Sequence, residues 1–207
     1  LDGQGSDESW AGYDYYLGNS DSIIQGTKSS PFKPNALNPE FFHLSKSDIY
    51  QQPFEDALLN KQYRDLFYTK IPRALRFNDR ISMMHSIELR EPFLDYRLVE
   101  NVFALEKEKK IKNGIQKWLF RELSKDTISN EILWAPKRPL QTPQREWLKG
   151  DLRNWAYDYI DIAQKTGWFN SKVINSELDK YKNLKSDSSF HIWQWISIGH
   201  MINMQKS

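Results

Sequence analysis

Apolar residues at helical spacing recur along this 207-residue chain, and this feature constrains its fold most. They share one face in three predicted helical segments, Phe54–Leu59, Leu66–Leu75 and Leu98–Phe103. Strand-like alternation is scarce, apart from a short strand expected at the start and a small hairpin around Asn113-Gly114. The pattern predicts a mainly α-helical chain with few or no strands.

Short polar signals predict where several helices begin and end. Glu91-Pro92 follows a helix predicted from Pro72 to about Ser86, and Asp95 is a good N-cap for the next helix. Thr142-Pro143 predicts an N-cap followed by proline at the first helical position. Asn170-Ser171 predicts a further helix start. Each of these signals is local, so we expect the helix boundaries to lie near them.

Three other stretches give further predictions: one loop, one apolar stripe and one final helix. The segment from Gly18 to about Gln52 is rich in turn-forming residues and predicts a long surface loop with short helical pieces. Ile115, Leu119 and Leu123 form an apolar stripe at helical spacing. Residues 190–204 are apolar on nearly all sides, which predicts a buried final helix.

Composition excludes several classes of function. The charged residues mix both signs and sum to +2, so no basic face typical of a nucleic-acid binder is predicted. The chain has no cysteine, which excludes disulfides and a thiolate nucleophile within these residues. No apolar run approaches the ~20 residues that span a bilayer. These properties predict a cytoplasmic protein that binds neither nucleic acid nor membrane.

The opening turn is the first of three candidate sites. Gly3-Gln4-Gly5 precedes a predicted helix whose first turn carries Asp7 and Glu8. Glycines allow the backbone to approach a ligand, and helix-terminal amides beside carboxylates suit a Mg²⁺-bound polyphosphate. An ordinary strand-to-helix turn has the same pattern.

The other two candidates are clusters of cations. Within residues 76–95, Arg76, Arg80 and Arg90 alternate with acids, which favours either a charged ligand or an internal salt-bridge network. Lys137-Arg138 lies in a proline-rich loop that is suited to clamp a phosphate, or is simply a solvated basic loop. The four histidines show no metal-ligand spacing.

Four motifs in order resemble one known family. Leu1–Glu8 with Gly12-Tyr13 resembles S-G-E-G-A-D-E-x-x-x-G-Y, and Asp79–Asp95 resembles D-R-x-S-M…E-x-R-x-P-F-L-D. Lys117–Arg121 resembles K-x-x-L-R, and Ala135–Lys137 resembles R-x-K with alanine at the arginine position. By these motifs the chain is similar, over nearly its whole length, to the synthetase domain of glutamine-hydrolysing asparagine synthetases.

The resemblance implies a fold and a reaction. Residues 1–207 would be a single fragment, the helical C-terminal portion of an adenine nucleotide alpha hydrolase-like (PP-loop ATP pyrophosphatase) synthetase domain. ATP would activate aspartate as a β-aspartyl-adenylate, and ammonia from glutamine would displace AMP. ATP and Mg²⁺ are the implied cofactors, and the implied partner is an N-terminal glutaminase domain of the same chain. A homodimer is compatible with this assignment. The S-G-G-x-D-S loop is absent, so we expect the fragment alone to be inactive.

The resemblance also implies roles for individual residues. Asp7 would hold Mg²⁺ on the pyrophosphate, and Lys137 would stabilise its developing charge. Asp2, Gly3 and Gly5 would line the nucleotide, with Asp2 at the position of the family's usual serine.

The remaining roles concern the amino-acid substrate and the catalytic set. Arg80 and Arg90 would bind the amino acid together with Glu88, and Gln4, Glu88 and Lys137 occupy the expected catalytic positions. Gln4 stands where the family has a catalytic glutamate, and glutamine cannot act as a general base. Two alternatives therefore stay open. The protein is a related ligase acting on another carboxylate, or it is a non-catalytic helical module that retains the fold.

Overall fold

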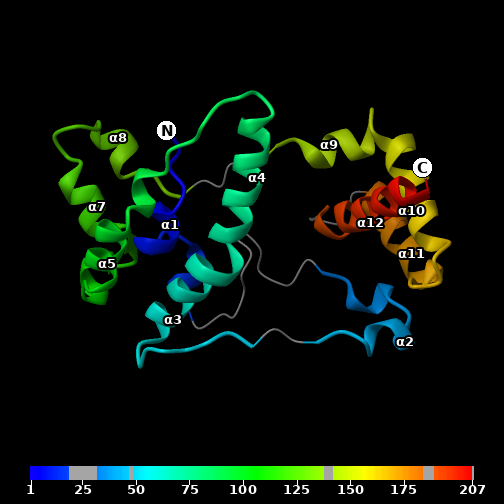
Figure 1. Cartoon of the computed structure of the whole chain (residues 1–207), viewed down its shortest axis with the longest axis horizontal. Coiled ribbons are helices and arrows are strands. Elements are labelled where there is room, and N and C mark those ends of the chain that lie inside the picture. Colours follow the sequence, from blue (N-terminus) through cyan, green and yellow to red (C-terminus); the bar gives the residue numbers. More distant parts are fainter. Residues whose placement is uncertain (19–31, 47–48, 138–141, 184–188, 207) are drawn as a thin grey trace. The chain divides into compact units, whose positions relative to one another are not determined.

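The computed structural model describes residues 1–18, 32–46, 49–137, 142–183 and 189–206 (Figure 1). The chain divides into two compact units. Unit 1 comprises Leu1–Gly26 and Asp48–Pro139, and unit 2 comprises Thr27–Ser47 and Leu140–Ser207. Helices dominate both units, and the sheet formed by the described residues has two strands. The predicted mainly α architecture is confirmed.

Unit 1 is a set of short helices around α1, the helix that follows the opening turn. α1 contacts α3, α5 and the π-helical turn η3. The elements of unit 1, in chain order, are α1 (Ser6–Ser9), η1 (Asp14–Tyr16), α3 (Ala57–Arg64), η3 (Asp65–Thr69), α4 (Ile71–Met83), η4 (Pro92–Leu94), α5 (Tyr96–Phe103), α6 (Lys107–Lys110), β1 (Ile111–Lys112), β2 (Ile115–Gln116), α7 (Trp118–Leu123) and α8 (Asn130–Leu133).

Local signals explain why several of these helices start where they do. The Asp56 carboxylate accepts a hydrogen bond from the Leu59 N–H at 2.8 Å and caps α3. Asp95 accepts from the Arg97 N–H at 3.0 Å and caps α5, as predicted. Pro72 lies in the first turn of α4, where its missing N–H costs no intrahelical bond. The helix predicted from Pro72 is confirmed and ends at Met83.

The predicted hairpin is also present. Ile111 pairs with Gln116 and Lys112 with Ile115. Asn113 and Gly114 both have positive φ, 52° and 76°, as a type I′ turn requires. The prediction that Ile115 belongs to a helical stripe is wrong, because Ile115 lies in β2 and α7 begins only at Trp118.

A buried carboxylate anchors the core of unit 1. Tyr15 and Tyr16 pack with Ala11 and Leu58, and both tyrosine hydroxyls donate to Asp65 Oδ2, at 2.6 and 2.8 Å. Asp65 is completely buried, so these hydrogen bonds and its ion pair with Arg64 compensate for its lost hydration. This arrangement fixes η1 against η3.

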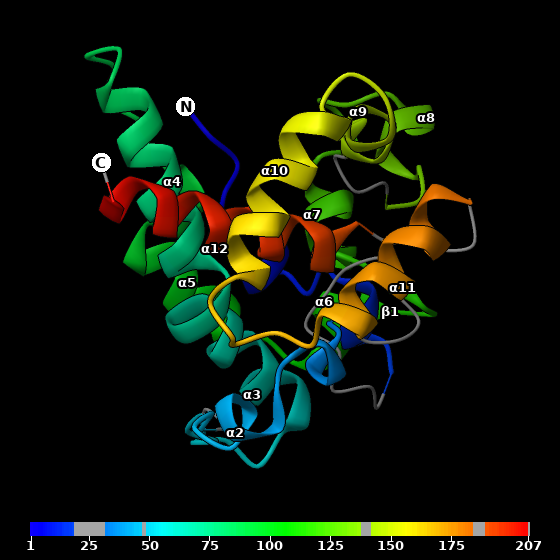
Figure 2. The same cartoon turned by 90° about the vertical axis from the view of Figure 1, so that its right-hand side faces the viewer.

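Unit 2 has its core between three long helices, α10 (Arg153–Gln164), α11 (Ser171–Lys182) and α12 (Phe190–Lys206). Asn170 caps the second of these by accepting from the N–H groups of Lys172 and Val173, which confirms the predicted start. In Figure 2, α12 crosses α10, and a Cβ on Gly199 would overlap the backbone of Tyr159 at this crossing. The elements of unit 2 are η2 (Pro34–Ala36), α2 (Pro39–Phe42), α9 (Gln144–Lys149), α10 (Arg153–Gln164), α11 (Ser171–Lys182) and α12 (Phe190–Lys206).

Three expectations need correction. Pro143, and not Thr142, occupies the N-cap position of α9, so the helix starts one residue later than predicted. α12 is not buried on all sides: Trp195 is 4% exposed, whereas Met201 is 61% exposed. The backbone of residues 1–3 forms no strand.

The long segment between Gly18 and Gln52 contains the short helices η2 and α2, as predicted. Its residues 19–31 and 47–48 lie outside the described part of the chain. None of the described helices is long and apolar enough to cross a membrane.

Candidate functional site

The site is built around Asp7 on the four-residue helix α1. Gly5 precedes this helix with φ 91°, a left-handed conformation that favours glycine. A Cβ at this position would also overlap the side chain of Leu94. Gly5 therefore allows the chain to turn sharply and present the first turn of α1.

Two lysines contact opposite oxygens of the Asp7 carboxylate. Lys117 Nζ lies 2.8 Å from Asp7 Oδ1, and Lys137 Nζ lies 2.7 Å from Asp7 Oδ2. Lys117 also donates to Ser6 Oγ at 3.1 Å. The three charged side chains are only 19–26% exposed, so water screens their interaction less than at an open surface. We refer to Asp7, Lys117 and Lys137 as the ion cluster; its formal charge is +1.

Gly12 packs directly against the ion cluster. Its N–H donates to the Asp7 carbonyl at 2.7 Å, which brings the chain back over α1. A Cβ at position 12 would overlap both Asp7 Oδ1 and Lys117 Cε. Only glycine fits here without moving the carboxylate or the lysine.

Buried polar side chains form hydrogen bonds to the C-terminal residues of α1. Gln62 is completely buried and donates from Nε2 to the carbonyls of Glu8 and Ser9, at 2.7 and 2.6 Å. Its Oε1 accepts from the buried Lys110 Nζ at 3.2 Å, and the hydroxyl of Tyr13 donates to Glu8 Oε1 at 2.6 Å. A helix this short cannot stabilise itself, so these bonds position the residues of α1.

The two adjacent acids of α1 have opposite pKa shifts. Burial alone would raise the pKa of Asp7, but the charges and hydrogen bonds of Lys117 and Lys137 outweigh it and lower that pKa below 3.8. Burial raises the pKa of Glu8, which has Tyr13 as its hydrogen-bond donor and no ion pair among the described residues. Asp7 is therefore the stronger acid of the pair.

The opening residues are held by α4 and by the segment that follows it. The Asp2 N–H donates to the Arg90 carbonyl at 2.9 Å, and the Asn78 amide donates to Asp2 Oδ2 at 2.8 Å. Burial together with the charge of Asp2 raises the pKa of Glu91, while hydrogen bonds from the Gln4 N–H and the Asn78 amide oppose this rise. The carboxylates of Asp2 and Glu91 are therefore hydrogen-bond acceptors close to Gln4.

The sequence of the chain identifies its protein family. The sequence model of the asparagine synthase family matches residues 1–205. The chain belongs to the asparagine synthase family. The ion cluster lies within the matched region and connects three of the four family motifs found in the sequence.

Individual relatives agree with this assignment. The chain is 26% identical over 195 residues to asparagine synthetase (glutamine-hydrolyzing) 1 of Bacillus subtilis (strain 168), covering 93% of this chain and 31% of that protein. It is 33% identical over 158 residues to the asparagine synthetase of Homo sapiens, covering 72% of this chain and 26% of that protein. For the Bos taurus asparagine synthetase the identity is 34% over 175 residues, 80% and 29% of the two chains.

The chain thus spans less than a third of the length of these relatives. No solved structure matches it. The PP-loop label of the fold and the assignment of residues 1–207 to one synthetase fragment accordingly stay predictions.

The structure brings some of the predicted site residues of this asparagine synthase family member together and leaves others apart. Asp7 and Lys137 form an ion pair, although they are 130 positions apart. Glu88 and Arg90 pair with each other at 3.0 Å, and about 70% of each side chain is exposed. Arg80 is exposed on the last turn of α4. Arg138 lies outside the described residues.

Sequence reasoning gave no role to four residues of the site. Lys117 and Gly12 lie in recognised motifs, so the motifs held a signal for them. Gln62 is a polar residue in a helical segment, and Lys110 is the last of the five charged residues 106–110; nothing local distinguishes either from a solvated position. Only the tertiary structure shows that both are buried.

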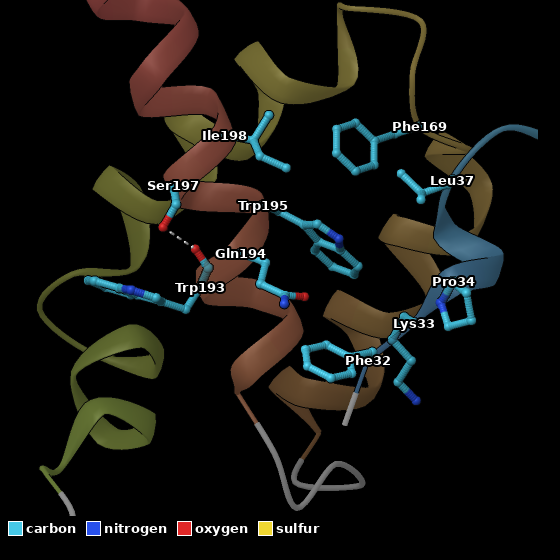
Figure 3. Close-up of a pocket in the computed structure, with 10 residues that line it drawn as sticks. All are labelled: Phe32, Lys33, Pro34, Leu37, Phe169, Trp193, Gln194, Trp195, Ser197 and Ile198. Carbon is cyan, nitrogen blue, oxygen red and sulfur yellow. Dashed lines mark hydrogen bonds between the residues drawn. The ribbon is translucent and has the colours of Figure 1, made fainter. Parts of the chain in front are cut away.

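A separate cavity of about 690 Å³ lies within unit 2 (Figure 3). Trp195 of α12 points into it, opposite Phe169 and Leu37. Among the described residues that line it, Lys33 is the one with an ionisable side chain, and Lys33 is paired with Glu177 at 3.1 Å. Because the one charged side chain in the described part of this lining is already paired, the cavity is less suited to phosphate chemistry than the ion cluster.

Proposed function

We propose that the complete protein converts aspartate to asparagine with ATP and with ammonia released from glutamine. In this proposal ATP is a substrate that activates the side-chain carboxylate as a β-aspartyl-adenylate, and ammonia displaces AMP. Family membership and the names of the relatives support the overall reaction. The ion cluster supports the nucleotide step.

The observation that carries the proposal is the pair of ammonium groups on Asp7. Adenylate formation releases pyrophosphate, so negative charge accumulates on the leaving group in the transition state. Ammonium groups held in place before the reaction stabilise such charge without having to reorganise. Asp7 holds Lys117 and Lys137 within 2.8 Å of its oxygens, and the excess positive charge favours an anion beside them.

The residues present fit a magnesium polyphosphate better than a free magnesium ion. No group of three or more potential metal ligands of the His, Cys, Asp or Glu type occurs among the described residues. Mg²⁺ keeps several waters and commonly binds one or two carboxylates together with substrate phosphates. Asp7 supplies one such carboxylate, and Lys117 and Lys137 supply the cations for the phosphates. Bound Mg²⁺ would neutralise part of the phosphate charge.

The remaining site residues have proposed roles in binding. Asp2, Gly3 and Gly5 contact the nucleotide through the opening turn. Arg80 and Arg90 bind the carboxylates of the amino acid, and Glu88 orients Arg90 through their ion pair.

Gln4 completes the catalytic set with Glu88 and Lys137, but it accepts no proton in this scheme, because an amide has no basic site near neutral pH. It contributes hydrogen bonds alone.

An ATP–pyrophosphate exchange assay on the full-length protein tests the proposal. We expect exchange that requires aspartate and that falls about 100-fold or more in Lys137→Ala, because one charge-stabilising donor is removed. Asp7→Ala should abolish exchange. Lys165→Ala is the control, since Lys165 forms an exposed ion pair with Asp161 and lies outside the ion cluster.

The outcomes separate the alternatives. Exchange with an acid other than aspartate would retain the ligase chemistry and change the substrate. If no carboxylate supported exchange, the proposal would fail, and the non-catalytic module would be favoured. If Lys137→Ala and Lys165→Ala had equal rates, the ion cluster would not be the pyrophosphate site.

A further inference from the structure

Arg121 connects the two segments that carry the lysines of the ion cluster. From the last turn of α7, its Nε donates to the Gln116 carbonyl at 2.9 Å. Its Nη1 donates to the carbonyl of Leu133 and, at 3.2 Å, to that of Ala135. One guanidinium thus bonds to three backbone carbonyls from two separate parts of unit 1.

Both parts lead directly to the ion cluster. Gln116 immediately precedes Lys117, and Ala135 lies two residues before Lys137. Lys117 has φ 53°, a left-handed conformation that non-glycine residues seldom adopt. The bond from Arg121 to Gln116 spans this residue and stabilises its unusual backbone.

Arg121 forms no ion pair with a carboxylate among the described residues. Its donors are directed to main-chain carbonyls, and the rigid planar fork fixes their relative positions. A lysine at this position would have one nitrogen on a flexible stem and could not reproduce three fixed bonds.

We propose that Arg121 is a positioning residue that sets the separation of Lys117 and Lys137 around Asp7. The inference rests on the proposed function, because it assigns a purpose to the spacing of the two ammonium groups. Without Arg121, the turn at Lys117 and the segment ending at Lys137 lose their common anchor. A displacement of about 1 Å in such groups can lower a rate about 100-fold.

The test uses ATP–pyrophosphate exchange by the full-length protein, with Arg121→Gln and Arg121→Lys. We expect the Arg121→Gln rate to fall about 100-fold at saturating substrates, with a smaller change in KM for ATP. Arg121→Lys keeps the charge but has a single donor nitrogen, and its rate should lie between those of Arg121→Gln and the wild type. Arg97→Gln is the matched control, because Arg97 pairs with Asp95 at the surface and should leave the rate unchanged.

A double-mutant cycle with Lys137→Ala separates positioning from simple loss of stability. If Arg121 acts through the lysines, Arg121→Gln should lower the rate far less in the Lys137→Ala background than in the wild type. An equal loss in both backgrounds would overturn the inference. If Arg121→Gln fails to fold, the same cycle with Arg121→Lys decides.

The inference and the proposed function fail in different ways. Absence of exchange in the wild type would refute the proposed function and, with it, the basis of the inference. Normal exchange in the wild type together with an unaltered rate in Arg121→Lys and Arg121→Gln would refute the inference alone.

Discussion

Replacing Gly12 with alanine tests the ion cluster by a purely steric change. The backbone of Gly12 is not in the left-handed region, so alanine can adopt its conformation without strain. The added Cβ would overlap Asp7 Oδ1 and Lys117 Cε, so both atoms must move by roughly 1 Å to restore van der Waals separation. The ion pair between Asp7 and Lys117 would therefore open.

The expected magnitude follows from the distance between the charges. At 2.8 Å and an effective dielectric constant of ~20, the Coulomb attraction is about 6 kcal/mol, and at ~4 Å it is about 4 kcal/mol. The difference of about 2 kcal/mol lies within the range of ~1–3 kcal/mol observed for overpacked sites. We expect the free energy of unfolding to fall by about 2 kcal/mol. The exchange rate should fall about 100-fold, because the ammonium group of Lys117 is displaced by roughly 1 Å.

The measurements are urea denaturation and ATP–pyrophosphate exchange on the full-length protein. Gly114→Ala is the control, because Gly114 has φ 76° with open space around its missing Cβ. That variant should lose about 1 kcal/mol through backbone strain and keep its exchange rate. If Gly12→Ala matched the wild type in both measurements, the packing of Gly12 against the ion cluster would be refuted.

Further predictions concern the interior of both units. Gln62→Leu leaves two carbonyls of α1 without a donor, and the free energy of unfolding should fall by about 2–3 kcal/mol in urea denaturation. Burial lowers the pKa of Lys110 from 10.5 to about 8, so between pH 8 and 10.5 the unfolded state binds more protons than the folded state. The free energy of unfolding should therefore rise with pH in this range, and Lys110→Met should abolish the rise in pH-dependent denaturation. Gly199→Ala should lower the melting temperature despite the better helix propensity of alanine, because its Cβ meets the backbone of Tyr159; an equal or higher melting temperature would contradict the close crossing. Tyr181→Phe removes a 2.7 Å hydrogen bond to a backbone carbonyl and should lower the free energy of unfolding by about 1 kcal/mol.

Much of the fold could be predicted because its determinants are local. α4, α5 and α11 have apolar stripes together with start signals, and Asn113-Gly114 forms the predicted hairpin turn. Ile115 was misassigned because β2 has only two residues, too few for an alternating pattern to show. The exposure of one side of α12 could not be predicted, since its composition is apolar on nearly all sides.

The site was less predictable because it depends on contacts between distant parts of the chain. Family resemblance indicated Asp7 and Lys137, but their direct contact appears only in the tertiary structure. The burial of Gln62 and Lys110 depends on the packing of α3 and α6 around α1, which no periodicity shows. Local patterns thus predicted the helices, while the geometry of the ion cluster required the folded chain.

The opposite pKa shifts of two neighbours on α1 have a consequence for acid conditions. The pKa of Glu8 is raised and that of Asp7 is lowered, so Glu8 takes up a proton first as the pH falls. Tyr13 then faces a neutral carboxyl, while Lys117 and Lys137 still share their counter-ion. On acidification Glu8 therefore loses its negative charge before Asp7 does. The ion pairs of Asp7 with Lys117 and Lys137 persist to lower pH.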